Sequence, residues 1–325
     1  MSVLVTGAAG FIGFHVAQTL LERGEEVYGF DNLNDYYSVA LKRARIAQLE
    51  KHRNFTLYEI DVAEPEAVSY ALSAQPETTA IIHLAAQAGV RHSLINPYVY
   101  VQSNVMGQVV LLEAARKLPL LRNFVYASSS SVYGGNKKQP FSEEDRVDRP
   151  VSLYAATKRA CELTAESYCH LFGISAVGLR FFTVYGPWGR PDMAAYLFAD
   201  AILAGRPIKV YNHGRMARDF TYIEDIVAGI IAARDCPPAG ASLHRIYNLG
   251  NNRPEPLLHF IEVLEQALGC RAQKEMMPLQ AGDVPESYAD IASAQKDLGF
   301  EPKTSIEVGI PRFIAWYKDY HHLAQ

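Results

Sequence analysis

Three glycines stand at regular spacing after the first apolar run of the chain, in the segment Gly7-Ala-Ala-Gly10-Phe-Ile-Gly13. The residues before them, Ser2–Thr6, are typical of a buried strand, and Phe11–Arg23 has apolar residues at helical spacing. Gly7 permits a tight turn, Gly10 lets a phosphate approach the backbone, and Gly13 allows close packing of helix on strand. Free N–H groups at the start of such a helix bind phosphate. The pattern therefore predicts a strand–turn–helix unit that binds a dinucleotide.

An acidic residue follows the second predicted strand, Glu26–Phe30. This residue, Asp31, lies at the distance from the glycines at which a carboxylate accepts hydrogen bonds from ribose hydroxyls. Its charge repels a 2′-phosphate, so the sequence favours NAD over NADP. Asp61, after the third predicted strand, is a candidate for an adenine contact, although a solvated turn aspartate is an equally good interpretation.

Strand candidates alternate with helical stretches along the first half of the chain. The alternation predicts an α/β fold, a Rossmann-type doubly wound parallel sheet with helices on both faces. The further strand candidates are Thr56–Ile60, Ala80–Ala85, Asn123–Ala127 and Ile174–Phe182, and the helical stretches are Ala40–Lys51, Glu64–Ala74, Tyr98–Leu118 and Ser152–Phe172.

The composition of the chain changes beyond about Pro187. Proline and glycine become more frequent there, and strand and helix candidates no longer alternate regularly. We therefore expect a smaller C-terminal α/β domain that binds the substrate, ending in a helix over Val308–His321. Residues 1–180, with a return segment near 216–248, are predicted to form the NAD-binding domain. Residues 181–215 and 249–325 are predicted to form the substrate domain.

Charge and cysteine usage exclude several other classes of protein. A formal net charge of -4 gives no reason to expect a nucleic-acid partner. No apolar run is long enough to span a bilayer, and the N-terminus does not resemble a signal peptide. The four cysteines form no CxxC pair, which argues against a metal site or a disulfide framework. We expect a cytoplasmic enzyme without a bound metal.

A phenol and an ammonium stand four residues apart in the segment Tyr154-Ala-Ala-Thr-Lys158, on one face of a predicted helix. A phenol is a poor base at neutral pH unless nearby cations stabilise the phenolate, and Lys158 and an oxidised nicotinamide both supply positive charge. A surface tyrosine–lysine pair is the common alternative. A serine run, Ser128–Ser131, follows the predicted strand at Asn123–Ala127, where parallel sheets line their ligand crevice. Glycine loop, serine run and YxxxK therefore agree on a hydride-transfer site.

These motifs resemble the extended short-chain dehydrogenase/reductase family over essentially the whole chain, and within it the nucleotide-sugar 4-epimerases. The resemblance implies a tightly bound NAD that is regenerated in each turnover, a UDP-sugar substrate, and a catalytic set made up of Ser129, Ser130, Tyr154, Lys158 and Thr183. It also implies a homodimer formed through the helices at Tyr98–Leu118 and Ser152–Phe172. The stretches that carry it are Thr6–Gly13, Asp31–Leu33, His83–Ala86, Ser128–Gly134, Tyr154–Lys158 and Arg218–Phe220.

The same resemblance implies a set of contacts to NAD. They lie in the glycine loop, at the ends of the following strands and in YxxxK. The expected residues are Gly7, Gly10, Phe11, Ile12, Gly13, Asp31, Asn32, Asp61, Val62, Leu84, Ala85, Ala86, Tyr154 and Lys158.

Two serines discriminate among the reactions of this family. Family dehydratases carry an Asp-Glu pair directly after the catalytic residue, where this chain has Ser130 and Ser131. Family decarboxylases carry a glutamate at the position of Ser131. A serine has no carboxyl group for the additional proton transfers of water elimination. Epimerisation at C4 is therefore favoured over dehydration and decarboxylation. A net dehydrogenase or reductase stays an alternative, and an NAD-binding redox sensor is disfavoured because Tyr154 and Lys158 are intact.

Three further stretches are similar to UDP-glucuronate 4-epimerases: Asp31–Tyr37, Ala88–Ser93 and Thr183–Met193. Galactose-type epimerases usually have asparagine where this chain has Thr183, which suggests a different C6 group. A glucuronate carboxylate needs charge-assisted donors, and Arg190 is the expected partner, with Thr183 and Ser130 as neutral donors and Arg91 as a second candidate. A solvated loop arginine is the alternative for Arg190.

The resemblance also suggests residues around the rest of the substrate. Arg218 is the candidate anchor for the diphosphate, with an ion pair to Asp219 or Glu224 as the alternative. Asp283 and Ser287 are expected at the sugar pocket. Galactose-type enzymes often have tyrosine at the position of Ser287, so the smaller residue leaves UDP-N-acetylglucosamine or UDP-glucose epimerisation open as alternative reactions.

Overall fold

A seven-stranded parallel sheet lies at the centre of the chain, whose computed structural model describes residues 1–280 and 284–323. The strand order is β11-β6-β5-β4-β1-β2-β3, and every neighbouring pair is parallel. This is the predicted doubly wound order, in which the chain reverses direction across the sheet beside β1. The strands are β1 (Ser2–Thr6), β2 (Glu26–Asp31), β3 (Phe55–Glu59), β4 (Thr78–His83), β5 (Asn123–Ser129), β6 (Ala176–Phe181) and β11 (His244–Leu249).

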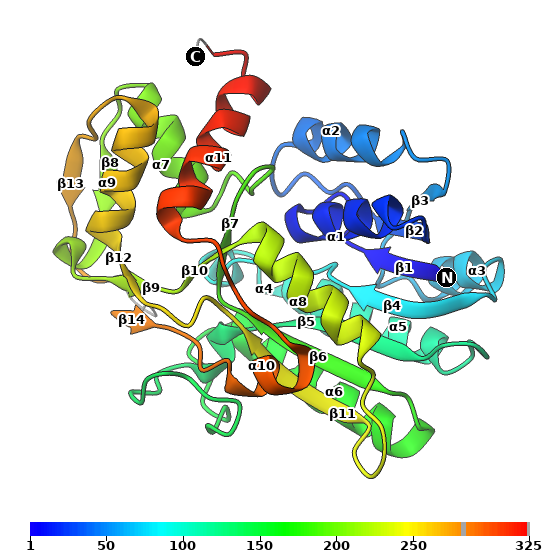
Figure 1. The fold of residues 1–325 in the computed structure, drawn as a ribbon. Helices are drawn as coiled ribbons and strands as arrows, with labels where there is room; N and C mark the ends of the chain where they lie inside the picture. Colours follow the sequence, from blue (N-terminus) through cyan, green and yellow to red (C-terminus); the bar gives the residue numbers. More distant parts are fainter. Residues whose placement is uncertain (281–283, 324–325) are drawn as a thin grey trace.

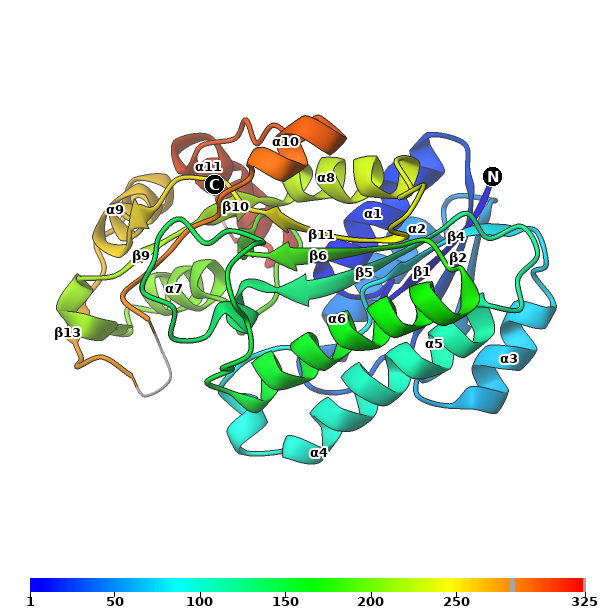
Figure 2. The ribbon, with the colours of Figure 1, turned by 90° about the horizontal axis from the view of Figure 1, so that it is seen from below.

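Helices cover both faces of the sheet (Figures 1 and 2). One face carries α1 (Phe11–Glu22), α2 (Val39–Leu49) and α8 (Ile223–Asp235), and the other carries α3 (Pro65–Ser73), α5 (Gly107–Ala115) and α6 (Leu153–Phe172). All residues of β1 are buried because helices pack on it from both sides. This double burial explains why the strands are continuous apolar runs in the sequence.

The predicted elements of the first half are present, with ends shifted by one or two residues. The helix expected over Tyr98–Leu118 is present from Pro97 to Ala115, but it is not a regular α-helix throughout. The structure has α4 (Pro97–Tyr100), a π-helical turn at Val101–Met106, and then α5. The wider turn contains Asn104, whose side chain bonds the backbone of Gln87 instead of facing solvent. Such π turns are frequent at functional sites.

The C-terminal part lies beyond the carboxyl ends of the strands, where the arrows of β5 and β6 point in Figure 2. Its helices are α7 (Ala194–Leu203), α9 (Leu257–Leu268) and α11 (Ile306–Tyr320), with α10 (Ala292–Leu298) packed beside β11. Short strands pair as β7 (Thr183–Tyr185) with β10 (Phe220–Tyr222), as β8 (Ile208–Val210) with β13 (Lys274–Met276), and as β9 (Ala217–Arg218) with β12 (Glu255–Pro256) and β14 (Glu286–Ser287).

The return segment near 216–248 contributes α8 and most of β11 to the large sheet and its cover. It begins, however, with β9 and β10, which pair outside that sheet. The division into an NAD-binding and a substrate domain therefore remains our proposal.

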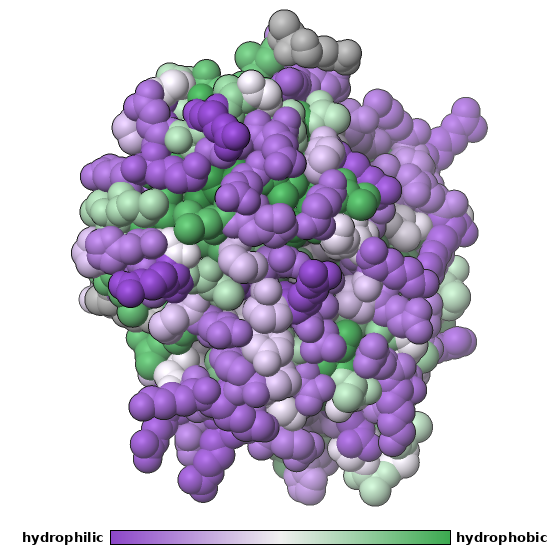
Figure 3. Space-filling model, turned by 60° about the vertical axis from the view of Figure 1, so that its left-hand side comes forward, coloured by the Kyte–Doolittle hydropathy of each residue, from purple (hydrophilic) through white to green (hydrophobic). Residues whose placement is uncertain are grey.

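The side of the molecule that carries α7 and α9 has a mainly hydrophilic surface, with hydrophobic side chains grouped in the upper half of Figure 3. Leu197 and Leu203 of α7 and Leu258 of α9 are among the exposed apolar residues. Within residues 1–280 and 284–323, no helix combines the length and the apolar character needed to cross a membrane.

Candidate active site

A cleft of about 450 Å³ opens at the carboxyl edge of the parallel sheet. Its walls come from the glycine loop, from the segments that follow β2, β3, β4 and β5, from α6, and from the segment after β6. Every residue predicted to contact NAD lines it. The predicted catalytic residues Ser129, Ser130, Tyr154, Lys158 and Thr183 line it as well. Ligands of open α/β sheets bind at this edge.

The glycine loop is so tight that a side chain is excluded at each of its three glycines. Gly7 has a φ of +71°, and its N–H donates to Phe30 O at 2.7 Å. A Cβ on Gly10 would lie 2.9 Å from the Gly7 oxygen, and a Cβ on Gly13 only 2.0 Å from it. Backbone N–H groups at the start of α1 are thus open to the cleft, and a dinucleotide pyrophosphate fits this cradle.

Asp31 supports the same loop from the end of β2. Its two carboxylate oxygens accept from Ala9 N at 3.0 Å and from Leu33 N at 2.9 Å. Burial raises the pKa of Asp31, and these N–H bonds together with the charge of Lys42 oppose the rise. A carboxylate has about four acceptor positions, so two remain for ribose hydroxyls. The position fits the predicted ribose contact.

Lys42 and Arg45, on α2, support the site and were missed by the sequence analysis. Lys42 lines the cleft, and its ammonium donates to Asn34 O at 2.7 Å and to Asn34 Oδ1 at 3.0 Å. The fully buried Arg45 donates to Ala9 O in the glycine loop at 2.8 Å and to Trp188 O at 2.6 Å. Arg45 thus ties the glycine loop to the segment that carries Arg190. Their only sequence signal is a cation pair at helical spacing, which looks like a solvated face.

The serine run follows β5 as a short 3₁₀ turn over Ser130–Tyr133. Ser129 is 8% exposed, and its hydroxyl accepts from Ser131 N at 3.2 Å and donates to Ser131 Oγ at 3.1 Å. Ser130 and Ser131 also line the cleft, at the positions where related dehydratases carry acids. A proton relay at Ser129 is therefore available, whereas these two neighbours supply no carboxylate.

The Tyr154–Lys158 pair lies near the start of α6, which begins at the Ser152 cap. Lys158 is 5% exposed, and its ammonium donates to Ala127 O at 2.8 Å, which holds α6 against the end of β5. The half-buried Tyr154 ring packs edge-on to Tyr100, with ring centroids 6.0 Å apart. Both side chains line the cleft, one helical turn apart on the same face of α6.

Asn104 of the π-helical turn also holds α6 in place, in addition to the contact of Lys158 with β5. Its amide donates to Thr157 Oγ1 at 3.0 Å and to Gln87 O at 3.1 Å, and its oxygen accepts from Gln87 N at 2.8 Å. Thr157 stands between Tyr154 and Lys158 in the chain. Asn104 therefore fixes α6 relative to the segment after β4, a role that no local pattern in the sequence indicated.

Arg190 reaches the cleft, as predicted, but its guanidinium already has a partner. It bonds both carboxylate oxygens of Asp192, at 3.0 and 2.5 Å, and Asp192 also accepts from Tyr36 OH at 3.1 Å. Burial would lower the pKa of Arg190, but the charge and hydrogen bonds of Asp192 raise it instead. The guanidinium is thus charged and half-buried at the cleft wall, not a solvated loop arginine.

Three of the remaining predicted substrate residues, Arg91, Arg218 and Ser287, are not part of the cleft lining. Arg91 stacks over the Tyr211 ring at 5.2 Å, and Arg218 donates to the carbonyls of Ala217 and Pro285. Ser287 pairs with Arg218 across β14 and β9. Asp283 lies outside the described residues. The substrate roles of these four residues stay predictions.

Asp219 and Glu224, the two acids considered as ion-pair partners of Arg218, form other contacts in the structure. Asp219 is fully buried and accepts from Thr221 Oγ1 at 2.8 Å and from Ala289 N at 3.0 Å. Glu224 forms an exposed ion pair with Arg312 at 3.3 Å. Asp219 thus serves the local backbone of the segments around β9.

Comparisons with known proteins show the family of this chain. Residues 3–250 match the model of the NAD dependent epimerase/dehydratase family. UDP-glucuronate 4-epimerase 2 of Arabidopsis thaliana is 48% identical over 334 residues, covering 99% of this chain and 76% of that protein. A probable UDP-glucuronate 4-epimerase of Rhizobium meliloti (strain 1021) is 46% identical, covering 98% of this chain and 97% of that protein.

A solved structure confirms the predicted fold class. UDP-glucuronic acid 4-epimerase from Bacillus cereus, in complex with UDP-glucuronic acid and NAD, superimposes with a TM-score of 0.91 at 34% identity. The match covers 98% of this chain and all of that one. This chain therefore belongs to the NAD dependent epimerase/dehydratase family.

Proposed function

We propose that the chain catalyses the NAD-dependent, reversible conversion of UDP-glucuronate to UDP-galacturonate by epimerisation at C4. The observation that carries the proposal is one cleft that contains the Tyr154–Lys158 pair, the serine run and the charged Arg190. The relatives that are named UDP-glucuronate 4-epimerases support the same substrate.

The chain's own residues move the proton at the C4 oxygen. The Ser129 hydroxyl bonds this oxygen, and the Tyr154 phenolate takes its proton as the C4–H bond breaks. Bound NAD supplies the acceptor for that hydride and returns it later, so no net oxidation occurs. After the sugar turns its other face, the Tyr154 phenol gives the proton back to the C4 oxygen. Lys158 stabilises the phenolate in both directions.

A uronic acid brings a hazard because its 4-keto form is a β-keto acid. If the C5–C6 bond breaks, carbon dioxide leaves, the electron pair passes to the C4 ketone as an enolate, and C5 then takes up a proton. We infer that Arg190, with Thr183 and Ser130, holds the carboxylate where this bond is badly aligned with the ketone. The absence of an acid at Ser130 and Ser131 supports epimerisation as the main outcome.

Incubation of the purified protein with UDP-glucuronate, followed by NMR, tests the proposed reaction. We expect UDP-galacturonate to accumulate to an equilibrium, NAD to co-purify, and no NADH to appear during turnover. UDP-pentose as the main product would identify a decarboxylase instead. Faster turnover of UDP-N-acetylglucosamine or UDP-glucose than of UDP-glucuronate would favour the alternative sugars.

Replacing Arg190 with leucine should lower kcat/KM for UDP-glucuronate by about 100-fold, because a hydrogen bond to a charged group contributes about 1.5–3 kcal/mol. UDP-glucose has no carboxylate, so its turnover should change by no more than about threefold. Steady-state kinetics on both substrates measure the difference. Arg206→Leu, which removes an exposed arginine paired with Asp200, is the control. Equal losses on the two substrates would mean that Arg190 serves the nucleotide or the fold.

We also propose a homodimer that forms through the face of α4, the π-helical turn and α6, which lie together in Figure 2. Large apolar side chains are exposed along these elements, unlike on an ordinary solvated helix face. They are Tyr98, Val101, Met106, Leu163, Leu171 and Phe172, with Leu94 and Ile95 in the segment just before α4. A second copy of the chain covers this face in the proposal.

The free thiols of all four cysteines support a reducing, cytoplasmic location.

Leu163→Glu should convert the dimer to a monomer, because it places a charge within the proposed apolar interface. Light scattering coupled to gel filtration measures the mass, which should fall from twice that of the chain to once. Leu197→Glu on α7 is matched, since Leu163 is 54% and Leu197 48% exposed. A wild-type monomer, or equal effects of both variants, would refute this interface.

A further inference from the structure

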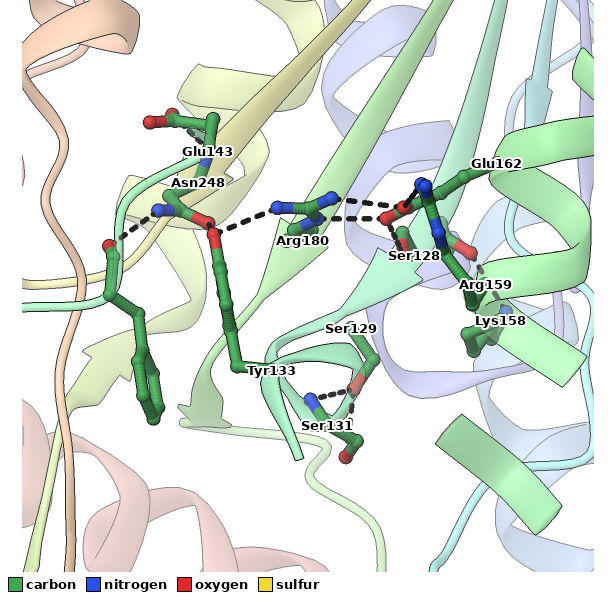
Figure 4. Close-up of polar contacts among 12 residues, drawn as sticks. Ser128, Ser129, Ser131, Tyr133, Glu143, Lys158, Arg159, Glu162, Arg180 and Asn248 are labelled. Carbon is green, nitrogen blue, oxygen red and sulfur yellow. Dashed lines mark hydrogen bonds and ion pairs between the residues drawn. The ribbon is translucent and has the colours of Figure 1, made fainter. Parts of the chain in front are cut away.

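A connected set of buried polar side chains lies directly behind the serine run (Figure 4). Its centre is Glu162 on α6, which is 1% exposed and accepts from Ser128 Oγ at 2.6 Å. Arg180 on β6 binds the same carboxylate through Nε at 2.8 Å and Nη2 at 2.9 Å. Arg159 adds a further bond at 2.8 Å from the outer side. The carboxylate is thus fully occupied without contacting the cleft.

Arg180 also reaches the end of the 3₁₀ turn that follows the serine run's first two residues. Its Nη1 donates to Tyr133 OH at 3.0 Å, and the guanidinium lies 4.9 Å from the centre of that ring. Ser128 immediately precedes Ser129, and Tyr133 ends the 3₁₀ turn that follows it. One ion pair, Glu162 with Arg180, therefore holds the chain on both sides of the catalytic serine.

The tyrosine hydroxyl extends these contacts towards the C-terminal part. It donates to Asn248 Oδ1 at 2.6 Å, and the Asn248 amide donates to Phe141 O at 2.9 Å and to Asp290 O at 3.0 Å. Glu143 accepts from the backbone N–H of Asn248 at 2.8 Å. The serine run is therefore fixed to β11 and to the segment before α10 as well as to α6.

The face of α6 that carries Glu162 also carries Tyr154, the proposed general base. Tyr154, Lys158 and Glu162 are four residues apart along α6 and therefore share one side of it. Lys158 bonds Ala127 O and Glu162 bonds Ser128 Oγ, two consecutive residues of β5. The next residue is Ser129. The helix that carries Tyr154 thus sets the position of the serine hydroxyl through these two contacts.

A contribution to the stability of the fold does not by itself explain why Glu162 and Arg180 form a buried ion pair at this place. Burial would raise the pKa of Glu162, but the hydrogen bonds and charge of Arg180 outweigh it and hold this pKa below its usual value, so the pair is charged. A buried ion pair is frequently no more stabilising than apolar residues of the same volume. What apolar residues cannot supply is directional bonding to Ser128 and Tyr133.

We propose that Glu162 and Arg180 are positioning residues, which hold the Ser129 hydroxyl at the distance from Tyr154 that proton transfer at C4 requires. The inference rests on the proposed 4-epimerase reaction. When this pair is broken, the sugar and NAD still bind, but proton return to the C4 oxygen slows. The 4-keto sugar then persists longer, and a larger share of it loses carbon dioxide.

Glu162→Gln should lower kcat at least tenfold while KM for UDP-glucuronate stays within about threefold, and the UDP-pentose share of product should rise at least threefold. The matched control is Glu25→Gln. Glu25 forms a second buried pair with Arg234, at 2.5 and 2.9 Å, at the start of β2 and far from the cleft. The control should keep kcat and the product ratio within twofold of wild type, even if its thermal midpoint falls.

A double-mutant cycle with Ser129→Ala distinguishes positioning from general loss of structure. If Glu162 acts through Ser129, Glu162→Gln should have less than a twofold further effect on kcat in the Ser129→Ala background. If the effects of Glu162→Gln and Ser129→Ala on kcat multiply in the double variant, the proposal is wrong. So would Glu162→Gln with the kcat and product ratio of the control.

Two milder variants decide the matter if Glu162→Gln does not fold. Tyr133→Phe removes one hydroxyl and keeps the ring stacked on Phe141, with centroids 4.6 Å apart. Ser128→Ala removes the other hydroxyl bond. Each should lower kcat about threefold or more without changing KM, and unchanged kcat in both would refute the proposal. A wild-type protein that makes no UDP-galacturonate would instead refute the proposed function itself, independently of these variants.

Discussion

Replacing Tyr154 with phenylalanine should lower kcat for UDP-glucuronate epimerisation by about a thousandfold, within the range that general acid–base catalysis provides. The phenol is the group that takes and returns the proton of the C4 hydroxyl, and the ring alone cannot do either. The ring itself packs edge-on to Tyr100, and phenylalanine keeps this contact, so the fold and the bound NAD should be retained. Product formation followed by NMR, with the NAD content of the purified variant, measures both expectations.

Tyr168→Phe provides the matched control for this substitution. Tyr168 lies on the same helix, but its hydroxyl donates to Glu113 at 2.8 Å, away from the cleft. Its loss should leave kcat within about twofold of the wild-type value, because surface changes of this kind have small effects. A Tyr154→Phe variant that retains a tenth of the wild-type kcat would exclude Tyr154 as the base.

Local patterns were sufficient for the nucleotide-binding half of the fold. The glycine loop, the buried strand before it and Asp31 at the end of β2 are close together in the chain, so their order already fixes a β–α–β unit. The same holds for Tyr154 and Lys158, which meet on one helix face wherever that helix packs. Each of these two groups of residues lies within about thirty consecutive residues of the chain.

The parts that escaped prediction depend on contacts between distant segments. Asn104 supports α6 from a π-helical turn, and Arg45 joins the glycine loop to Trp188, more than 140 positions further along the chain. Periodicity indicates that a charged or amide residue lies on a helix, but not what it meets across the molecule. For the same reason the pairing of Arg190 with Asp192 is clear only in the folded chain.

The Glu162–Arg180 pair shows this limit most clearly. In the sequence, Glu162 continues the spacing of Tyr154 and Lys158 and looks like a solvated i, i+4 partner of a lysine. In the structure it is buried, because β6 brings Arg180 beneath α6. Functional positioning therefore arises where a strand and a helix distant in sequence meet, and the sequence alone indicates only the groups that react.

Gly13→Ala should abolish NAD retention and reduce epimerisation more than a hundredfold. The added methyl group would lie 2.0 Å from the Gly7 oxygen, far inside any van der Waals contact, and the neighbour is backbone that cannot rotate away. The helix α1 must therefore move from β1, and the N–H groups that face the pyrophosphate move with it. Overpacking of this kind also lowers the free energy of unfolding by about 1–3 kcal/mol.

The NAD-to-protein ratio after purification is the decisive measurement for this variant, with thermal unfolding recorded alongside. Gly135→Ala is the control, since its nearest neighbour, Val151 Cγ1, would lie 3.9 Å from the new methyl group. That control should retain NAD in the wild-type ratio. If the Gly13→Ala protein purifies folded and with equimolar NAD, the glycine loop does not form the pyrophosphate cradle. If it is folded, free of NAD and inactive even at millimolar added NAD, then close approach of α1 to β1 is what holds the cofactor for repeated turnover.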